Sequence, residues 1–285
     1  MVKQLVDKVC IVAGGTKGIG FAIAKNFVER GAYVYICGRS DLQAKKAALK
    51  IDPRGEFAFG MGVDVIKQIE IESFVNKIIN RFHRIDVLVN TAGIFAPFGL
   101  FEKIPIEEIM KNVDVNLGGS MRLSHEVIPF MKKHKFGRII LFSGGGIGGD
   151  IPLENASAYY TSKGGLTCLT EALAAELKNY NITVNAILPG QILTQMTKST
   201  FKYSDEQLGP VLSKFTKNLK LMRGQRLEPV INLVNFLVSR KASHVNGKLL
   251  SARWDSIPKL AEELPSSEYT LRRIKKGLYE KVVKS

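Results

Sequence analysis

Short apolar runs rich in β-branched residues alternate with longer segments of helical periodicity along almost the whole chain. Parallel strands need long crossover connections, and helices cover both faces of their sheet, so such strands are apolar throughout. The pattern therefore predicts an α/β fold with a single doubly wound, seven-stranded parallel sheet. The expected strands are Val9–Ala13, Tyr33–Cys37, Phe57–Val63, Ile85–Asn90, Arg138–Phe142, Thr183–Leu188 and Lys248–Ser251.

The segments between these runs have the apolar spacing of amphipathic helices. Residues 191–227 break the alternation with polar sequence and are expected to form a loop or helical lid over a substrate. No shift in composition marks a domain boundary before about residue 252, so we expect one domain over 1–252 and a basic extension over 253–285. The expected helices are Ile19–Arg30, Asp41–Lys50, Gln68–Phe82, Ile106–Lys132, Ser157–Asn179 and Glu228–Ser239.

The net charge of +15 is the one outlier in composition. Such an excess suits an anionic ligand, nucleic acid, an acidic protein partner or a solvated basic surface. No nucleic-acid-binding motif accompanies the charge, so the sequence does not favour nucleic acid as a partner. Part of the excess lies near the end of the chain, at Arg272, Arg273, Lys275, Lys276, Lys281 and Lys284.

The distribution of apolar residues and cysteines bears on location. No run approaches the roughly 18 apolar residues that a membrane span needs, and no signal-peptide core follows Met1. Cys10 and Cys37 fall inside apolar runs, as buried thiols do, and no disulfide framework or zinc signature is present. We therefore expect a cytoplasmic protein without a membrane partner or a metal.

A glycine-rich turn follows the first expected strand and leads directly into a helix. Glycines at 14, 18 and 20 permit a tight turn, close approach of a pyrophosphate to the backbone, and close packing of the helix on the strand. The helix N-terminus then faces the anion. The alternative is an ordinary turn, but the strand before it and the helix after it favour a dinucleotide site at Gly14, Thr16, Lys17, Gly18, Ile19 and Gly20.

The tip of the second expected strand indicates which dinucleotide is bound. No Asp or Glu is present there to accept hydrogen bonds from a ribose 2′-hydroxyl, whereas Arg39 and Ser40 are. A guanidinium can hold a 2′-phosphate by a bidentate contact, and Lys17 would add a second positive charge. The sequence thus favours NADP(H) over NAD(H), unless both cations are ordinary surface residues.

Further polar and small residues follow the third and fourth expected strands. Asp64 and Val65 are placed to meet the adenine, and Asn90, Ala92 and Gly93 lie at the carboxyl edge, where ligands of such sheets bind. Both groups could instead serve the turns at the strand ends.

Tyr159 and Lys163 are four residues apart on an expected helix and therefore share a face. A phenol has a reference pKa of about 10, which is too high for easy proton exchange at neutral pH. An ammonium about 4 Å away at an effective dielectric of about 20 would stabilise the phenolate by about 4 kcal/mol. This attraction would lower the pKa of the phenol by roughly three units before desolvation opposes it. Tyr159 is therefore a plausible general acid/base.

Taken together, residues 5–252 resemble the short-chain dehydrogenase/reductase family, in particular members similar to 3-oxoacyl-carrier-protein reductases. The resemblance is carried by five features in the family's order, which are Gly14/Gly18/Gly20, Asn90-Thr91-Ala92-Gly93, Asn116, Tyr159-x-x-x-Lys163 and Pro189-Gly190.

The resemblance implies a Rossmann-type fold and an NADP(H)-dependent interconversion of a carbonyl and a secondary alcohol. It implies that Tyr159 protonates the carbonyl oxygen, that Lys163 also holds the nicotinamide ribose, and that Asn116 holds a proton-relaying water. It further implies a homodimer or homotetramer built on the helices at 106–132 and 157–179. The nicotinamide would be bordered by Pro189, Gly190, Ile192 and Thr194.

The chain departs from the family pattern at the serine that normally binds the substrate oxygen. Counting back thirteen residues from Tyr159 reaches Gly146, whereas aligning on the fifth strand places Gly144 there. Ser143 is a tentative substitute, Ser157 is another, and backbone amides of the glycine run are a third possibility.

Two functions remain open on the sequence. The first is an oxidoreductase acting on a small or carrier-linked substrate, which the basic charge suggests is anionic. Its pocket would be lined by residues 144–156 and 191–227. The second is a catalytically impaired NADP(H)-binding sensor or scaffold protein, suggested by the missing serine.

Overall fold

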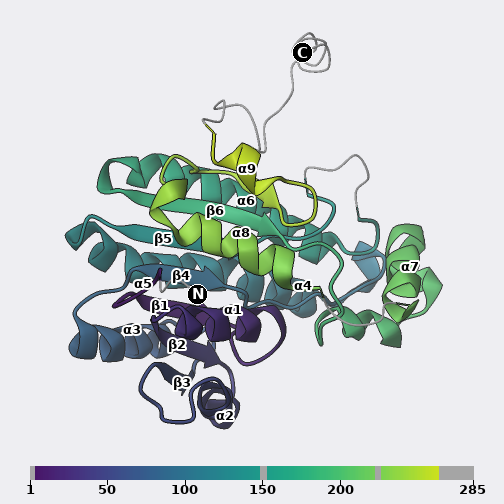
Figure 1. Ribbon diagram of the computed structural model, residues 1–285. Helices are drawn as coiled ribbons and strands as arrows, with labels where there is room; N and C mark the ends of the chain where they lie inside the picture. The colour runs from purple at the N-terminus through teal and green to yellow at the C-terminus, as the bar shows by residue number, and fades with distance from the viewer. Residues whose placement is uncertain (1–3, 148–152, 222–225, 263–285) are drawn as a thin grey trace.

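The computed structural model describes residues 4–147, 153–221 and 226–262. Its core is a seven-stranded, all-parallel sheet in the order β3-β2-β1-β4-β5-β6-β7 (Figure 1). This confirms the predicted Rossmann-type fold. The strands are β1 Val9–Ala13, β2 Tyr33–Gly38, β3 Ala58–Gly62, β4 Val87–Asn90, β5 Gly137–Phe142, β6 Ile182–Leu188 and β7 Leu249–Ser251.

Strand β4 begins two residues later than the sequence predicts, at Val87. The reason is Asp86, whose carboxylate accepts hydrogen bonds from Val9 N at 3.0 Å and Lys8 Nζ at 2.9 Å, and is also bonded by Arg84. This buried carboxylate, 1% exposed, thus closes the amino edge of the sheet beside β1.

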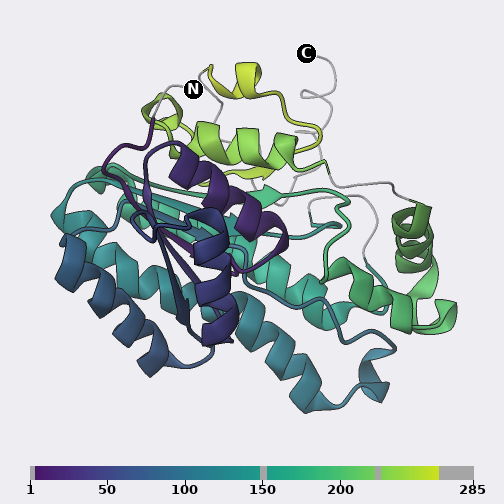
Figure 2. The same cartoon turned by 60° about the horizontal axis from the view of Figure 1, so that its bottom comes forward.

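Two apolar clusters cover the two faces of the sheet. Helices α1 and α8 contribute to one cluster, whereas α3, α5 and α6 contribute to the other. Figure 2 shows α1 and α8 on one side of the strands and α3 with α5 on the opposite side. The helices are α1 Gly18–Glu29, α2 Asp41–Ile51, α3 Gln68–Phe82, α4 Ile106–Val113, α5 Gly119–Lys133, α6 Ser157–Leu177, α7 Asp205–Leu221, α8 Glu228–Val238 and α9 Ile257–Leu260.

The single helix predicted over 106–132 is divided. A π-helical turn, Asp114–Gly118, separates α4 from α5 and carries Asn116. Such turns are rare and are frequent at functional sites. The apolar periodicity of the flanking residues does not reveal this extra residue per turn, so the sequence predicts one helix.

The segment 191–227 is partly helical. It contains a short 3-10 helix, Thr197–Lys202, and α7, which bends at Gly209 where φ is +69°. In Figure 1, α7 projects away from the sheet at its right-hand side. Leu208 and Leu212 of this helix pack with Tyr159, which fits the expected helical cover over a substrate site.

Packing continues past residue 252. Leu260 of α9 is fully buried in the same cluster as α8, and its carbonyl lies 3.0 Å from His244 Nε2. The beginning of the expected extension is therefore part of the main body, whereas its basic residues from Arg272 onward lie outside the described residues. Across the described ranges, no helix is long and apolar enough to cross a membrane.

Candidate active site

The glycine-rich turn after β1 lies against the loop that follows β4. A Cβ atom at Gly14 would lie 2.7 Å from Ala92 N, and one at Gly20 would lie 2.5 Å from Thr91 Oγ1. Gly14 also has φ of +75°, in the region that favours glycine. Both glycines are therefore required by the contact between these two loops, which form one side of the carboxyl edge.

Helix α1 begins at this turn, and the first backbone N–H groups of the helix are available as hydrogen-bond donors. Its N-cap residue is Lys17, and no side chain of the described residues caps it. Its first turn contains no acidic residue, and Gly18 has φ of +58°. The first N–H groups of a helix have no partner within the helix, and together with the helix dipole they favour an anion. The turn thus fits a pyrophosphate, and Ile19 follows it as a half-buried residue.

Two exposed cations lie beside the glycine turn, one at the tip of β2 and one at the start of α1. Thr16 packs on Gly38 at the end of β2, with its Cγ2 2.9 Å from a Cβ built there, so the glycine turn and the tip of β2 are neighbours. Arg39 and Lys17 are exposed, and neither forms an ion pair with another described residue. Their chemistry fits a 2′-phosphate. Ser40 instead caps α2, because its Oγ accepts a hydrogen bond from Gln43 N at 3.3 Å.

The residues after β3 and β4 make turn contacts of their own. Asn90 donates to Ser120 Oγ at 2.8 Å and accepts from Ala92 N at 3.0 Å, so its side chain ties β4 to α5. Asp64 Oδ1 accepts from Ile66 N at 3.4 Å. Val65 is buried beside Gly119. These contacts favour the turn interpretation for the side chain of Asn90, while Asp64 remains half-buried at the carboxyl edge.

Asn116 joins three parts of the site. Its Oδ1 accepts from Ile94 N at 2.8 Å, and its Nδ2 donates to Ile94 O, Asn112 Oδ1 and Ser162 Oγ at 2.8–3.0 Å. The side chain is fully buried, and its Oδ1 would lie 2.8 Å from a Cβ at Gly93. Asn116 thus fixes the loop after β4 to α6, the helix that carries the tyrosine.

Asn112 and Ser162 are partners in this network that the sequence did not predict. Asn112 Nδ2 also donates to Ala96 O at 2.8 Å, and Ser162 Oγ donates to Tyr159 O at 2.8 Å. The four-residue spacing of Asn112 and Asn116 was the available signal, since it predicts two amides on one helical face.

Lys163 and Tyr159 are both buried on α6, with 4% and 8% of their surface exposed. Lys163 Nζ donates to the carbonyl of Phe142 at 2.6 Å and lies 5.8 Å from the centre of the Tyr159 ring. The Tyr159 hydroxyl forms no hydrogen bond with another described residue. The pair is therefore adjacent, as the spacing predicts, but the ammonium is directed to the end of β5.

Burial dominates the proton affinities of both groups. It raises the pKa of the Tyr159 phenol and lowers the pKa of the Lys163 ammonium to about 8. The expectation that Lys163 lowers the pKa of the phenol is thus wrong for this geometry. The reason is that desolvation of each charged form outweighs an attraction between groups that are not hydrogen-bonded to each other.

Gly144 is the residue that faces the tyrosine hydroxyl. A Cβ atom there would collide with the hydroxyl and ring of Tyr159, whereas one at Gly146 would meet Leu153 and Tyr160. Residue 144 therefore holds the place of the family's serine. Ser143 Oγ lies within 3.2 Å of Lys163 O and Thr167 Oγ1, on the α6 side of β5, and this geometry does not favour it as the substrate-binding hydroxyl.

An aromatic and aliphatic cluster covers Tyr159. The ring of Phe95 lies 4.4 Å from that of Tyr159, and Phe98 lies 4.8 Å from Phe95. Leu208 and Leu212 of α7 complete the cluster. Sequence reasoning missed Phe95 and Phe98, although two aromatic residues shortly after the Asn90–Gly93 motif were a usable signal. The surroundings of the phenol are therefore apolar.

The loop after β6 crosses the carboxyl edge toward the glycine turn. The Thr194 methyl group would lie 3.7 Å from a Cβ at Gly18, and Met196 Cε would lie 3.5 Å from one at Gly93. Pro189 and Gly190, with φ of +80° at the glycine, start this loop, and Ile192 anchors it with 4% exposure. These residues border the space between the glycine turn and Tyr159.

Known proteins resemble this chain over most of its length. The short chain dehydrogenase family model matches residues 8–205. A 3-oxoacyl-acyl-carrier-protein reductase of Aquifex aeolicus is 35% identical over 252 residues, covering 87% of this chain and 96% of the relative. A dehydrogenase/reductase of Rattus norvegicus is 30% identical over 244 residues, covering 86% and 85%. The crystal structure of a levodione reductase superposes with a TM-score of 0.76 at 29% identity, covering 87% and 96%.

The family model spans strands β1 to β6, the glycine turn and the helix that carries Tyr159 and Lys163. These matches agree with the strand order and with the resemblance stated from the motifs. The chain belongs to the short-chain dehydrogenase/reductase family of NAD(P)-dependent oxidoreductases.

Proposed function

We propose that this protein interconverts a carbonyl and a secondary alcohol with NADP(H), using Tyr159 as the general acid/base. The observation that carries the proposal is the position of Tyr159, whose hydroxyl faces Gly144 in an apolar cluster at the carboxyl edge. Purified protein should oxidise NADPH with members of a panel of ketones and 3-oxoacyl thioesters. Absence of oxidation with all of them would contradict the proposal.

Each residue has a defined task in this reaction. NADP(H), when bound, supplies the hydride for reduction or accepts it in the reverse direction. The Tyr159 hydroxyl donates its proton to the carbonyl oxygen. Lys163 Nζ, 5.8 Å from the ring centre, would stabilise the phenolate once its ammonium turns from Phe142 O toward the phenol. Asn116 positions α6 against the loop after β4 through its four hydrogen bonds. Lys163, once its bond to Phe142 O is exchanged, would also hold the ribose.

The substrate oxygen needs a second donor in place of the missing serine hydroxyl. The N–H groups of Gly144 and Gly145 follow the end of β5 and make no hydrogen bond to another described residue. We propose that they, with Tyr159, hold the oxygen, because backbone donors aimed at developing charge can replace a side-chain hydroxyl.

Gly144→Ala should lower kcat at least about tenfold, because its Cβ must displace the Tyr159 hydroxyl, and misplaced catalytic groups lose rate steeply. Gly144→Ser should do the same, since its Cβ occupies the same place. The matched control is Gly164→Ala on α6, whose Cβ would meet only Ile147 Cδ1 at 3.9 Å, an ordinary contact, and should leave kcat within about twofold. Steady-state kinetics on the three variants decide this. A Gly144→Ser enzyme faster than the wild type would refute this placement of Tyr159.

The preference for NADP(H) rests on Arg39 and Lys17. Arg39→Asp should weaken NADPH binding at least about thirtyfold, because it removes a bidentate cation and places a carboxylate near the 2′-phosphate. NADH binding should change less than about threefold. Lys46→Asp makes the same change of charge on the exposed side of α2 and should leave both affinities nearly unchanged. Calorimetry with each dinucleotide tests this, and equal weakening of both would reject the assignment.

The substrate class follows from the cover over Tyr159. Because Phe95, Phe98, Leu208 and Leu212 surround the phenol, a carbonyl with apolar substituents is favoured. The relatives include reductases of carrier-linked 3-oxoacyl groups and of levodione, so both carrier-linked and free ketones are proposed. The positive charge of the chain would favour an anionic carrier or substrate.

The assembly and location remain proposals. Met110 of α4 and Met121 of α5 are about half exposed and line a cavity of about 520 Å³ together with Leu117. This apolar face supports a homodimer or homotetramer, which the mass in solution would test. Cys10 and Cys37 are buried free thiols, as predicted, and Cys168 is an exposed one, which is consistent with a reducing cytoplasm.

A further inference from the structure

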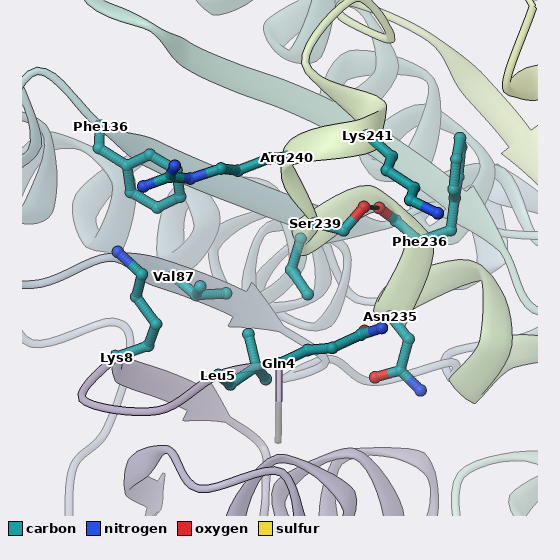
Figure 3. A pocket seen from close by; sticks show the side chains of 11 residues that line it. Gln4, Leu5, Lys8, Val87, Phe136, Asn235, Phe236, Ser239, Arg240 and Lys241 are labelled. Carbon is teal, nitrogen blue, oxygen red and sulfur yellow. Dashed lines mark hydrogen bonds between the residues drawn. The ribbon is translucent and has the colours of Figure 1, made fainter. Parts of the chain in front are cut away.

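A second pocket lies at the amino edge of the sheet, opposite the edge that carries Tyr159. Its volume is about 400 Å³. Lys8 precedes β1, Val87 begins β4, and Phe136 precedes β5, so the pocket opens where these strands start. Figure 3 shows Lys8 below the Phe136 ring and Arg240 extending from the turn after α8 to the same ring, whereas Lys241 extends the opposite way, toward Phe236.

The pocket combines an apolar floor with a cationic rim. Leu5, Val87 and Val238 are nearly fully buried and supply the floor. Arg240 and Lys241 are exposed and form no ion pair with another described residue. This arrangement suits a ligand with an apolar body and a negative charge at one end, because cations on long stems cover apolar surface while their charged heads remain available.

The charge around the pocket is not balanced. Asp86 is shared between Lys8 and Arg84, and both are already bonded to it. Arg138 lies behind Phe136, with its guanidinium 4.5 Å from the ring centre. It is fully buried, and no carboxylate among the described residues pairs with it.

Arg138 is a buried cation that is affected by this excess of positive charge. Its guanidinium donates to the carbonyls of Gly137 and Asn181 and to Ser243 Oγ, while Nε has no partner among the described residues. Burial, followed by repulsion from Arg240, lowers its pKa to about 10. An anion beside Arg240 would relieve that repulsion, since it lowers the local potential that both guanidinium groups experience.

A polar wall closes the far end of the pocket. Asn235 lines it, is 9% exposed, and has a buried Oδ1 without a partner within the described residues. A buried polar atom without a hydrogen bond costs free energy until a ligand or water supplies one. A water could donate to this oxygen, whereas a carboxylate, which only accepts, could not, so Asn235 does not select the charge of an occupant.

We propose that this pocket binds a small amphipathic carboxylate, with its apolar body on Leu5 and Val87 and its carboxylate beside Arg240. The occupant is a ligand additional to the proposed cofactor and substrate, which lie at the opposite edge of the sheet. Apolar contact alone would not select such a ligand, whereas the unpaired cations select its charge.

The test uses calorimetry on the full-length protein with sodium octanoate, octanamide and sodium acetate. Octanoate should bind saturably, octanamide should bind at least tenfold more weakly because it lacks the charge, and acetate should bind at least tenfold more weakly because it lacks the apolar body. The double variant Arg240→Gln/Lys241→Gln should weaken octanoate binding at least tenfold and leave octanamide unchanged.

The matched control is Lys132→Gln/Lys133→Gln at the end of α5, which removes the same charge outside the pocket. It should retain octanoate affinity within about twofold. Absence of saturable octanoate binding would overturn the proposal. Equal affinities for octanoate and octanamide would overturn it too, as would unchanged octanoate binding in the Arg240/Lys241 variant or an equal loss in the control.

Discussion

Tyr159→Phe is expected to lower kcat by about 10²–10⁴-fold, because it removes the proton that the proposed mechanism transfers to the carbonyl oxygen. Its effect on stability should be small. The hydroxyl makes no hydrogen bond with another described residue, and the ring retains its contact with Phe95 at 4.4 Å. Kinetics and urea unfolding on the same preparation therefore separate a chemical role from a structural one.

The chain offers a matched control in the next residue. The Tyr160 hydroxyl lies 3.3 Å from Gly146 O. The residue four positions after Tyr160 is Gly164, not a lysine. Tyr160→Phe should keep kcat within a few-fold. If Tyr159→Phe kept full turnover, the assignment of the acid/base would fail. If the wild type bound NADPH by calorimetry but turned over nothing, the sensor or scaffold alternative would be favoured instead.

The fold could be predicted because its determinants are local. Strands such as Val9–Ala13 and Val87–Asn90 are short runs that are buried at every position, and each crossover is long enough to be a helix. The glycine turn could be predicted for the same reason, since Gly14, Gly18 and Gly20 lie within one loop. Gly14 and Gly20 are also required by close contacts with Thr91 and Ala92, and these contacts cannot be read from the local sequence pattern.

What the sequence did not predict depends on contacts between distant residues. Ser162 approaches Asn116 and Asn112 only because α4, the π-helical turn and α6 pack together. The raised pKa of Tyr159 has the same origin, because it depends on burial by α7 and the loop after β4 rather than on the four-residue spacing to Lys163. Spacing predicted which groups would be neighbours, but packing decides their protonation.

Gly144 illustrates how structure resolves an ambiguity in spacing. Counting back from Tyr159 placed Gly146 at the position of the family's serine, whereas aligning on the fifth strand placed Gly144 there. The sequence could not decide between the two glycines. The direction of the Cα substituent chooses, because only the one at 144 would meet the Tyr159 hydroxyl. The side chain of Ser143 points the other way, because its Oγ lies 3.2 Å from Thr167 Oγ1 on α6.

Lys163→Met should lower kcat by at least about 10²-fold. It should also change how the free energy of unfolding depends on pH. Burial lowers the pKa of Lys163 to about 8 in the folded protein, against an ordinary value of 10.5. Between these values the unfolded chain binds the proton and the folded chain releases it, so the free energy of unfolding rises with pH across this window. Below about pH 8 the wild type bears the full cost of the buried ammonium, on the order of 3 kcal/mol.

Methionine has a similar length and no charge, so the variant lacks this pH dependence. The difference in unfolding free energy, wild type minus Lys163→Met, should therefore increase by about 2–3 kcal/mol from pH 7 to pH 10.5 in urea titrations. Lys133→Met, at an exposed position on α5, should show no such increase. A flat difference for Lys163→Met would mean that the ammonium is not desolvated. A lysine retained at this cost to stability is expected where its charge serves catalysis, because stability and activity are often opposed at active sites.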